Sequence, residues 1–370
     1  MLVTLLQENL NQALAILTKA IPTKPPLPIL ASIKLSAAND RCTASATDLY
    51  FGVITTVPAN IETDGEIVIP GKQFKEIVAS LPPGPIKLEL TAGTLTIVSG
   101  KSKTTLQCQS TEEYPPFPEV TGVSATINTE QLEKIDSLIG FAASIDVARP
   151  ILTSILFELS LEKSRMVATD GFRLALLDTQ QGIEVAQETR TLLPAKAVSE
   201  VARLAKQQAI QSVSVVFSEE LKQAQWSVGD VSVFVRMIEG TYPPYEKIIP
   251  SDFTTTVTFD VEELKSHAKR ALVLARESSN IITFSVTKDA VVLSATSALV
   301  GTYTGTLERA EVTGESVEIA FNAKYVQDFL SAVPGNSITM AIKESLKPIE
   351  LSSPELPEYT YVVMPFKVAG

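Results

Sequence analysis

The stretch Pro28–Ile33, which reads PILASI, recurs 122 residues later as Pro150–Ile155, which reads PILTSI. The short string Ala46–Asp48 (ATD) recurs at the same distance as Ala168–Asp170. Two matches in one register indicate that a folding unit of about 120 residues is repeated. A more divergent copy, Ala295–Ser297 (ATS), follows 127 residues after Ala168, so we expect three units in the chain of 370 residues.

One helix per unit is predicted from three related strings, Ile69–Lys72, Leu193–Lys196 and Phe321–Lys324. An apolar residue stands two, five, six and nine positions after each lysine, which is the spacing of one helical face. These residues are Phe74, Ile77, Val78 and Leu81 in the first unit, Val198, Val201, Ala202 and Ala205 in the second, and Val326, Phe329, Leu330 and Val333 in the third. Turn formers at Pro82–Gly84 and Pro334–Asn336 end the first and last of these helices.

A second helix opens each unit, again with apolar residues at helical spacing. Its apolar positions are Leu10, Ala13, Leu14, Leu17 and Ile21, then Leu132, Ile135, Leu138, Ile139 and Ala142, then Leu264, Ala268, Ala271, Leu272 and Ala275. Short β-branched runs such as Glu66–Ile69, Leu95–Val98 and Ser212–Val216 predict antiparallel strands between the helices. The expected fold class is α+β, with two helices packed on antiparallel sheets in each of three repeated domains.

Proline-dense segments at Tyr114–Pro118 and Tyr242–Tyr245 separate one unit from the next. We therefore place the domains at residues 1–122, 123–252 and 253–370. The two cysteines show no CxxC spacing, and the chain has neither an amino-terminal signal sequence nor an apolar run of membrane-spanning length. A cytoplasmic protein that does not enter the membrane is the expectation.

The charge is unevenly distributed between the helices and the rest of the chain. The formal net charge of −11 argues against a protein that coats nucleic acid over its whole surface. In the six predicted helical windows, however, twelve Lys and Arg stand against eight Asp and Glu, so the helices carry +4 and the remainder −15. The helices are the basic part of an acidic protein, and in a closed ring of such units they would line the hole.

No catalytic site and no metal or cofactor site is predicted. The only histidine, His267, lies on the apolar side of its helix, which favours a packed ring, and neither a triad nor a zinc site has its partners. Gly71-Lys72 fails the phosphate-loop pattern in its glycine spacing and in the residue after the lysine, Gln73. Asp48 and Asp170 occupy equivalent places in separate units, so a hairpin-turn role is preferred to a carboxylate pair.

Four motifs, taken in order along the chain, resemble the bacterial sliding clamp, the β subunit of DNA polymerase III. They are Leu27–Leu30 (LPIL), Ala168–Leu174 (ATDGFRL), Tyr242–Tyr245 (YPPY) and Tyr361–Pro365 (YVVMP). The resemblance implies a head-to-tail homodimer that closes a ring around double-stranded DNA. It also implies a processivity factor that tethers the DNA polymerase III catalytic subunit, the clamp loader and other proteins with a clamp-binding motif.

The resemblance places Lys24, Arg149 and Lys196 where DNA-contacting residues lie, and repeat symmetry adds Lys72 and Lys324. Such cations attract phosphates without reading sequence, and the ring then keeps the polymerase at a high effective concentration near the DNA. Pro150 and Ile151 stand where some relatives carry tyrosines near DNA. The dimer seam is assigned to Leu106 of one chain against Val273 and Leu274 of the other.

An apolar groove for partner peptides is implied between the second and third domains. Its residues are Leu152, Thr169, Gly171, Phe172, Arg173, Leu174, Pro243, Lys247, Ile248, Tyr325, Val362, Val363, Met364 and Pro365. Phe172 and Lys247 replace a His and an Arg of some relatives, which alters the polar rim. From the residues alone, without the family, Val362–Met364 is better read as a final edge strand in a core.

Two other functions remain open at this point. One is a repeat scaffold that binds peptides only, without a ring and without DNA. The other is a hydrolase whose catalytic residues form no recognisable motif. Dimerisation and retention on circular DNA distinguish the clamp from the scaffold, and turnover would be needed to support the hydrolase.

Overall fold

The computed structural model describes residues 1–38 and 41–367. The chain divides into two compact units, one of residues 1–129 with 203–237 and one of residues 130–202 with the part that follows residue 237. The predicted second domain is thereby shared between the two units. The reason is strand pairing, because one part of that domain pairs with the first domain and the other part with the third.

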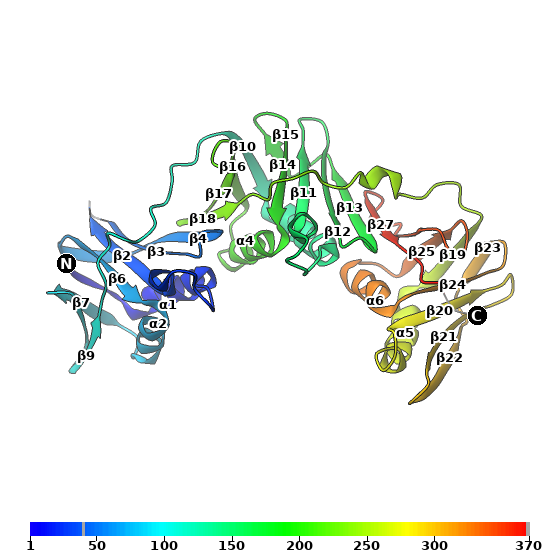
Figure 1. Ribbon diagram of the computed structural model, residues 1–370, viewed down its shortest axis with the longest axis horizontal. Coiled ribbons are helices and arrows are strands. Elements are labelled where there is room, and N and C mark those ends of the chain that lie inside the picture. The colour runs from blue at the N-terminus through cyan, green and yellow to red at the C-terminus, as the bar shows by residue number, and fades with distance from the viewer. Residues whose placement is uncertain (39–40, 368–370) are drawn as a thin grey trace. The chain divides into compact units, whose positions relative to one another are not determined.

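The first unit begins with a complete copy of the repeat (Figure 1). Its elements are β1 (Leu2–Leu6), α1 (Gln7–Leu17), η1 (Thr18–Ala20), η2 (Pro28–Ala31), β2 (Ser32–Ala38), β3 (Arg41–Thr47), β4 (Phe51–Val57), β5 (Ala59–Thr63), β6 (Gly65–Pro70), α2 (Gly71–Ser80), β7 (Pro85–Thr91), β8 (Thr94–Ser99) and β9 (Ser102–Gln107). The helices α1 and α2 pack against each other. One sheet has the strand order β5-β1-β7-β8-β9, which leaves β9 at an edge.

The first unit also contains four strands from the middle of the chain. They are β10 (Val123–Asn128), β16 (Ser212–Ser218), β17 (Gln223–Val228) and β18 (Val231–Arg236). These strands continue the sheet of the first domain in the order β10-β16-β17-β18-β4-β3-β2-β6, with all of the adjacent pairs antiparallel. Phe234 of β18 lies opposite Gly52 of β4.

The second unit repeats this junction further along the chain. Its elements are α3 (Thr129–Leu138), η3 (Gly140–Ala142), η4 (Pro150–Thr153), β11 (Ser154–Leu159), β12 (Ser164–Thr169), β13 (Arg173–Thr179), β14 (Ile183–Val185), β15 (Thr189–Pro194), α4 (Ala195–Gln207), η5 (Tyr245–Lys247), β19 (Thr255–Asp260), α5 (Val261–Ala275), β20 (Ile281–Val286), β21 (Val291–Ser297), β22 (Gly301–Leu307), β23 (Glu311–Gly314), β24 (Val317–Asn322), α6 (Ala323–Ala332), β25 (Ser337–Ile342), β26 (Ile349–Ser352) and β27 (Tyr359–Val363). α3 begins at the last residue of the first unit, and α4 ends in that unit.

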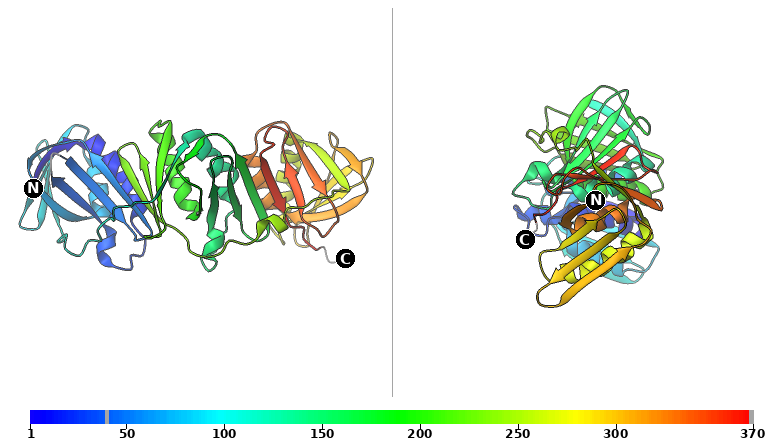
Figure 2. Two further views of the ribbon diagram at one scale, coloured as in Figure 1. Left: turned by 90° about the horizontal axis from the view of Figure 1, so that it is seen from above. Right: turned by 90° about the vertical axis from the view of Figure 1, so that its right-hand side faces the viewer.

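The long sheet of the second unit has the order β15-β11-β12-β13-β27-β26-β25-β19-β23. Figure 2 shows the red strand β27 beside the green strand β13, although the two are far apart in the sequence. A smaller sheet has the order β22-β21-β20-β24, which leaves β22 at an edge. The helices α5 and α6 pack against each other, and α5 covers β21 and β22.

The predicted α+β architecture is confirmed, but four helices are shorter than the apolar pattern indicated. Leu81 and Val333, the last predicted face residues of α2 and α6, are extended residues just after the helix ends. α1 ends at Leu17 and tightens into the 3₁₀ turn η1, so Ile21 lies outside it in an extended conformation, as the following proline favours. α3 ends at Leu138, because Gly140 is a poor helix former and the chain continues as η3. The predicted strands are confirmed as β6, β8 and β16. Within residues 1–38 and 41–367, no helix is long and apolar enough to cross a membrane.

Candidate functional site

The turn between β12 and β13 is held by its own side chains. The Asp170 Oδ1 atom accepts hydrogen bonds from the backbone N–H groups of Phe172 (2.9 Å) and Arg173 (3.0 Å). The Thr169 hydroxyl accepts from the Gly171 N–H (3.0 Å) and donates to the Arg173 carbonyl (2.6 Å). Gly171 has φ +94°, a conformation that favours glycine. The predicted hairpin-turn role of Asp170 is confirmed.

A small pocket opens beside this turn. Leu174 and Val362 lie opposite each other on β13 and β27, are each 1% exposed and form its apolar floor. Phe172 and Met364 are exposed at its rim, and the Met364 N–H donates to the Phe172 carbonyl (2.8 Å). The residues that line the pocket are Thr169, Gly171, Phe172, Arg173, Leu174, Ile248, Val362 and Met364. All eight belong to the groove predicted from the sequence.

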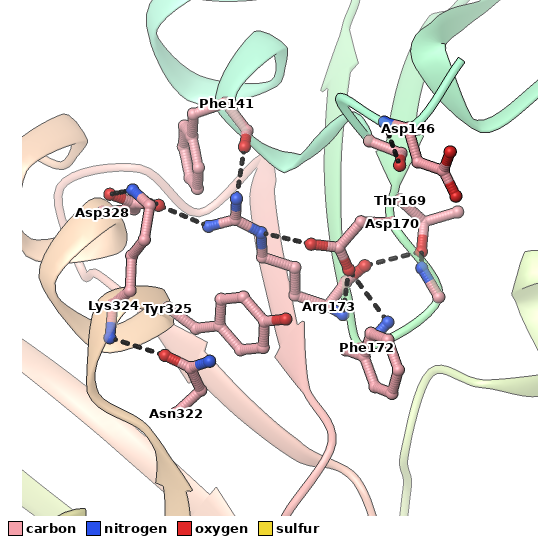
Figure 3. A network of polar contacts seen from close by, with 12 residues as sticks. Phe141, Asp146, Thr169, Asp170, Phe172, Arg173, Asn322, Lys324, Tyr325 and Asp328 are labelled. Carbon is pink, nitrogen blue, oxygen red and sulfur yellow. Dashed lines mark hydrogen bonds and ion pairs between the residues drawn. The ribbon is translucent and has the colours of Figure 1, made fainter. Parts of the chain in front are cut away.

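Arg173 fixes one wall of the pocket through a buried network (Figure 3). Its guanidinium donates to Asp170 Oδ2 (3.1 Å), to Asp328 Oδ2 (2.6 Å) and to the Phe141 carbonyl (2.6 Å). It also lies over the ring of Tyr325, 4.7 Å from the centroid, in a cation–π contact. Arg173 is only 7% exposed, so these partners replace the water that it loses on folding.

The charge of Arg173 is retained in this environment. Burial lowers the pKa of Arg173, whereas Tyr361, Asp328 and Asp170 raise it by more, so the net shift is upward. Asp328 is shared, because the Lys324 ammonium also donates to its two carboxylate oxygens at 2.9 and 3.0 Å. A polar chain therefore runs from the pocket wall at Arg173 to an exposed lysine on α6.

The remaining predicted groove residues lie outside the pocket lining. Val363 is buried and does not line the pocket, and Tyr325 contacts the pocket wall only through its ring contact with Arg173. Leu152 is half-buried, and its carbonyl accepts from the Ser144 N–H (2.8 Å). Pro243 and Pro365 are half-buried, and Lys247 is exposed in η5.

Phe141 and Asp328 were missed by the sequence reasoning. Asp328 stands 155 residues from Arg173, and nothing in its local pattern distinguishes it from an ordinary surface acid four residues after Lys324. Phe141 contributes its backbone carbonyl and its ring, 5.3 Å from the guanidinium carbon, and a carbonyl has no sequence signature.

All five predicted DNA-contacting cations are exposed, but their surroundings differ. Arg149 donates to Asp146 (3.1 Å), and Lys324 is paired with Asp328. Among the described residues, Lys24, Lys72 and Lys196 make no ion pair. Lys72 lines a groove of the first unit between α2 and the segment of residues 18–32, and Lys24 belongs to this segment.

The three predicted seam residues lie at or near sheet edges. Leu106 is half-buried on β9, an edge strand of the first unit. Val273 is 63% exposed and Leu274 is half-buried, and both lie on α5. This helix packs on β22, an edge strand of the second unit. His267 of the same helix is half-buried with Nδ1 2.9 Å from the Tyr303 hydroxyl, which agrees with the expected packed ring.

Three family models together match nearly the whole chain. The DNA polymerase III beta subunit N-terminal domain matches residues 1–118, the central domain matches residues 126–244, and the C-terminal domain matches residues 246–367. The chain belongs to the DNA polymerase III beta subunit family. The resemblance drawn from the four sequence motifs is thereby confirmed. As a member of this sliding clamp family, the chain is a processivity factor of DNA replication and not an enzyme.

Similarity to individual family members extends over the full length. The chain is 30% identical to the beta sliding clamp of Synechocystis sp., with 98% of each chain covered. Its structure is similar to DNA polymerase III, beta subunit, from Thermotoga maritima (29% identity, TM-score 0.91, 100% of each chain). It is also similar to the C. crescentus beta sliding clamp (26% identity, TM-score 0.92, 100% of each chain).

Proposed function

We propose that two copies of this chain close head to tail into a ring around double-stranded DNA, and that the pocket beside Arg173 tethers replication and repair proteins to it. The observation that best supports the ring is a repeated junction between strands of neighbouring domains. The strand that follows the Ala-Thr-Asp turn pairs with the last strand of the next domain twice, as β4 with β18 and as β13 with β27.

The third copy of this junction is not formed within one chain, because its two strands lie at the edges of two separate sheets. The counterpart of β4 and β13 in the third domain is β22, which follows Ala295–Ser297, and it is an edge strand. The counterpart of β18 and β27 in the first domain is β9, also an edge strand. Open strand edges invite pairing, so β22 of one chain fits β9 of another, and two such contacts close a dimer. Leu106 lies on β9, which agrees with its proposed place at the seam.

The two intrachain junctions also predict the register of this seam. Gly52 lies opposite both Thr47 and Phe234, and Leu174 lies opposite both Thr169 and Val362. By the same rule, Thr302, which lies opposite Thr296, takes the place of Leu174. The matching hairpins of β8–β9 and β17–β18 put Thr105 in the place of Phe234. Thr105 and Thr302 are therefore expected to face each other across the seam.

The exposed cations support contact with the phosphates of DNA. We place Lys24, Lys72, Arg149, Lys196 and Lys324 on the surface of the hole. Lys24, Lys72 and Lys196 make no ion pair among the described residues, so they are the strongest candidates for phosphate contacts that do not depend on base sequence.

The pocket supports the tethering role because it combines an apolar floor with polar groups at its wall, the composition of a peptide site. The C. crescentus relative was solved with polyethylene glycol bound at a region assigned there to beta-motif tethering. As occupants we propose short peptide segments of the DNA polymerase III catalytic subunit, the clamp loader and other proteins with a clamp-binding motif. The predicted domain boundaries at residues 122 and 252, and a cytoplasmic location, complete the proposal.

The proposed ring is tested by the topology of the DNA that it holds. The protein, loaded by a clamp loader on nicked circular DNA, should remain bound through a high-salt wash and should be released when the circle is cut. Equal retention on circular and linear DNA would contradict encirclement. A chain that binds partner peptides but stays monomeric at micromolar concentration would instead support the peptide-only scaffold.

A further inference from the structure

The turn beside the pocket has a near-identical copy at the first junction, inside the first unit. There the Thr47 hydroxyl accepts from the Leu49 N–H (3.0 Å), and Asp48 Oδ1 accepts from the N–H groups of Tyr50 (2.9 Å) and Phe51 (2.6 Å). The Tyr50 carbonyl accepts from the Arg236 N–H (2.8 Å), as the Phe172 carbonyl accepts from the Met364 N–H. Leu49 even adopts φ +77° where Gly171 has φ +94°.

The segments that lead away from these two junctions are matched as well. The Tyr114 hydroxyl donates to the Ser45 carbonyl (3.2 Å), and the Tyr242 hydroxyl donates to the equivalent carbonyl of Val167 (3.4 Å). Burial raises the pKa of Tyr114 to about 12, so this hydroxyl stays a donor at neutral pH. The turn backbones and the tyrosine anchors are thus repeated, and the two junctions differ in the segment that follows each tyrosine and in a few side chains.

The decisive difference lies on the face that forms the pocket floor at the second junction. Gly52 and Phe234 take the places of Leu174 and Val362. The ring of Phe117 lies against Phe234, with centroids 4.9 Å apart. A Cβ atom added to Gly52 would lie 2.6 Å from Phe117 Cε1, so the ring occupies the space that a side chain at residue 52 would need.

The counterpart of Phe117 at the second junction does not fill the pocket. Tyr245 follows Tyr242-Pro243-Pro244 as Phe117 follows Tyr114-Pro115-Pro116. Its hydroxyl, however, donates to Glu158 Oε2 (2.6 Å) and lies 3.5 Å from the Arg165 guanidinium. Tyr245 packs in the same buried cluster as Leu174 and Val362, but neither it nor its partners Glu158 and Arg165 line the pocket beside Arg173.

We infer that the face of Gly52 and Phe234 is a second apolar docking pocket, which the chain's own Phe117 occupies in the way that a partner's side chain would. Phe117 acts as an internal ligand, so that of the two junctions only the second has an open pocket. When the phenylalanine is removed, the vacated face takes an aromatic or bulky aliphatic group. The inference rests on the proposed tethering function only in naming a peptide as the natural ligand. The occupancy of the face by Phe117 can be tested with a hydrocarbon probe, without any peptide.

The first test is a cycle of substitutions at residues 52 and 117 in the full-length protein. Phe117→Ala should lower the melting temperature by emptying the pocket, and Gly52→Leu should lower it by clashing with the ring. The double variant should melt higher than either single variant, because the leucine introduced at residue 52 refills the space as Leu174 does at the second junction. Phe117→Leu, which keeps a plug, should stay close to the wild type. Melting-temperature losses that simply add in the double variant would overturn the inference.

The second test uses toluene as the probe of the emptied face. Toluene should raise the melting temperature of Phe117→Ala by more than it raises that of the wild type, and the excess should vanish in the double variant. An equal effect of toluene on all three proteins would overturn the inference. Neither test involves a peptide. If the wild type bound no partner peptide while the cycle behaved as expected, the proposed tethering function would fail and the internal ligand would stand.

Discussion

The first and second strand junctions share the backbone of their turns and differ in whether a pocket is open beside the turn. At the first, Gly52 makes room for Phe117, whose ring packs on Phe234. At the second, Leu174 and Val362 form the floor of a small pocket beside a turn that carries Gly171. A binding site and a packed interior surface are therefore separated by a few side chains, while the hydrogen bonds that set the turn are kept.

The largest expected effect concerns Arg173, which stands where the first junction has the uncharged Phe51. Arg173→Ala leaves the carboxylates of Asp170 and Asp328 without their buried cation, so we expect a loss of about 3 kcal/mol in the free energy of unfolding. Urea unfolding measures this loss. Lys324→Ala is the control, because it removes only the exposed partner of Asp328 and should cost less than about 1 kcal/mol. Similar losses in both variants would refute the buried network.

The next effect concerns the open rim. Met364→Ala and Phe172→Ala should each weaken the binding of a polymerase-derived peptide about tenfold, because both remove exposed apolar contacts beside the floor. Arg236→Ala and Tyr50→Ala change the equivalent rim positions of the closed junction and should leave peptide affinity unchanged. Fluorescence anisotropy titration gives all four dissociation constants. If the first-junction variants weakened binding equally, the two junctions would not differ as described.

A smaller effect separates the equivalent lysines of the three domains. Lys72→Ala and Lys196→Ala should each lower the slope of log affinity against log salt by about one for DNA binding, as expected for one lost phosphate contact. Lys324→Ala should change the slope less, because Asp328 already neutralises this lysine. Affinities measured on circular DNA at several salt concentrations test the ranking, which three equal slopes would contradict.

The smallest effect is a pH dependence at helix α5, which packs on the edge strand β22. The pKa of His267 is lowered by burial and by Arg270, against the opposing effect of Glu263 and Glu308. The unfolded chain, with an ordinary histidine pKa near 6.5, binds its proton first as the pH falls. The histidine therefore makes the protein less stable below about pH 6.5 than above it. His267→Gln should lose less unfolding free energy between pH 7.5 and pH 5.5 than the wild type does, and an identical loss would contradict the shift.

The repeat could be predicted from the sequence because matched strings recur at one spacing. The helices could be predicted because their apolar residues recur at helical spacing. Helix ends were less predictable, since Ile21 and Ile139 continue an apolar pattern that the backbone does not follow. The eight pocket residues could be predicted only through family resemblance. The pairing of Arg173 with Asp328 and the fit of Phe117 onto Gly52 depend on residues that only tertiary packing brings together, and no local pattern reports them.

The repeated junction itself, extended to a third copy between two chains, is tested most directly by disulfide crosslinking. In a Cys108→Ser background, a chain with Thr105→Cys and Thr302→Cys should form covalent dimers on oxidation, because these positions are expected to face each other. In the matched control, Thr306→Cys replaces Thr302→Cys, which moves the cysteine four residues along β22 from the position expected to face Thr105. This control should remain monomeric on a denaturing gel. Efficient crosslinking of the control, or none in the matched pair, would contradict the account.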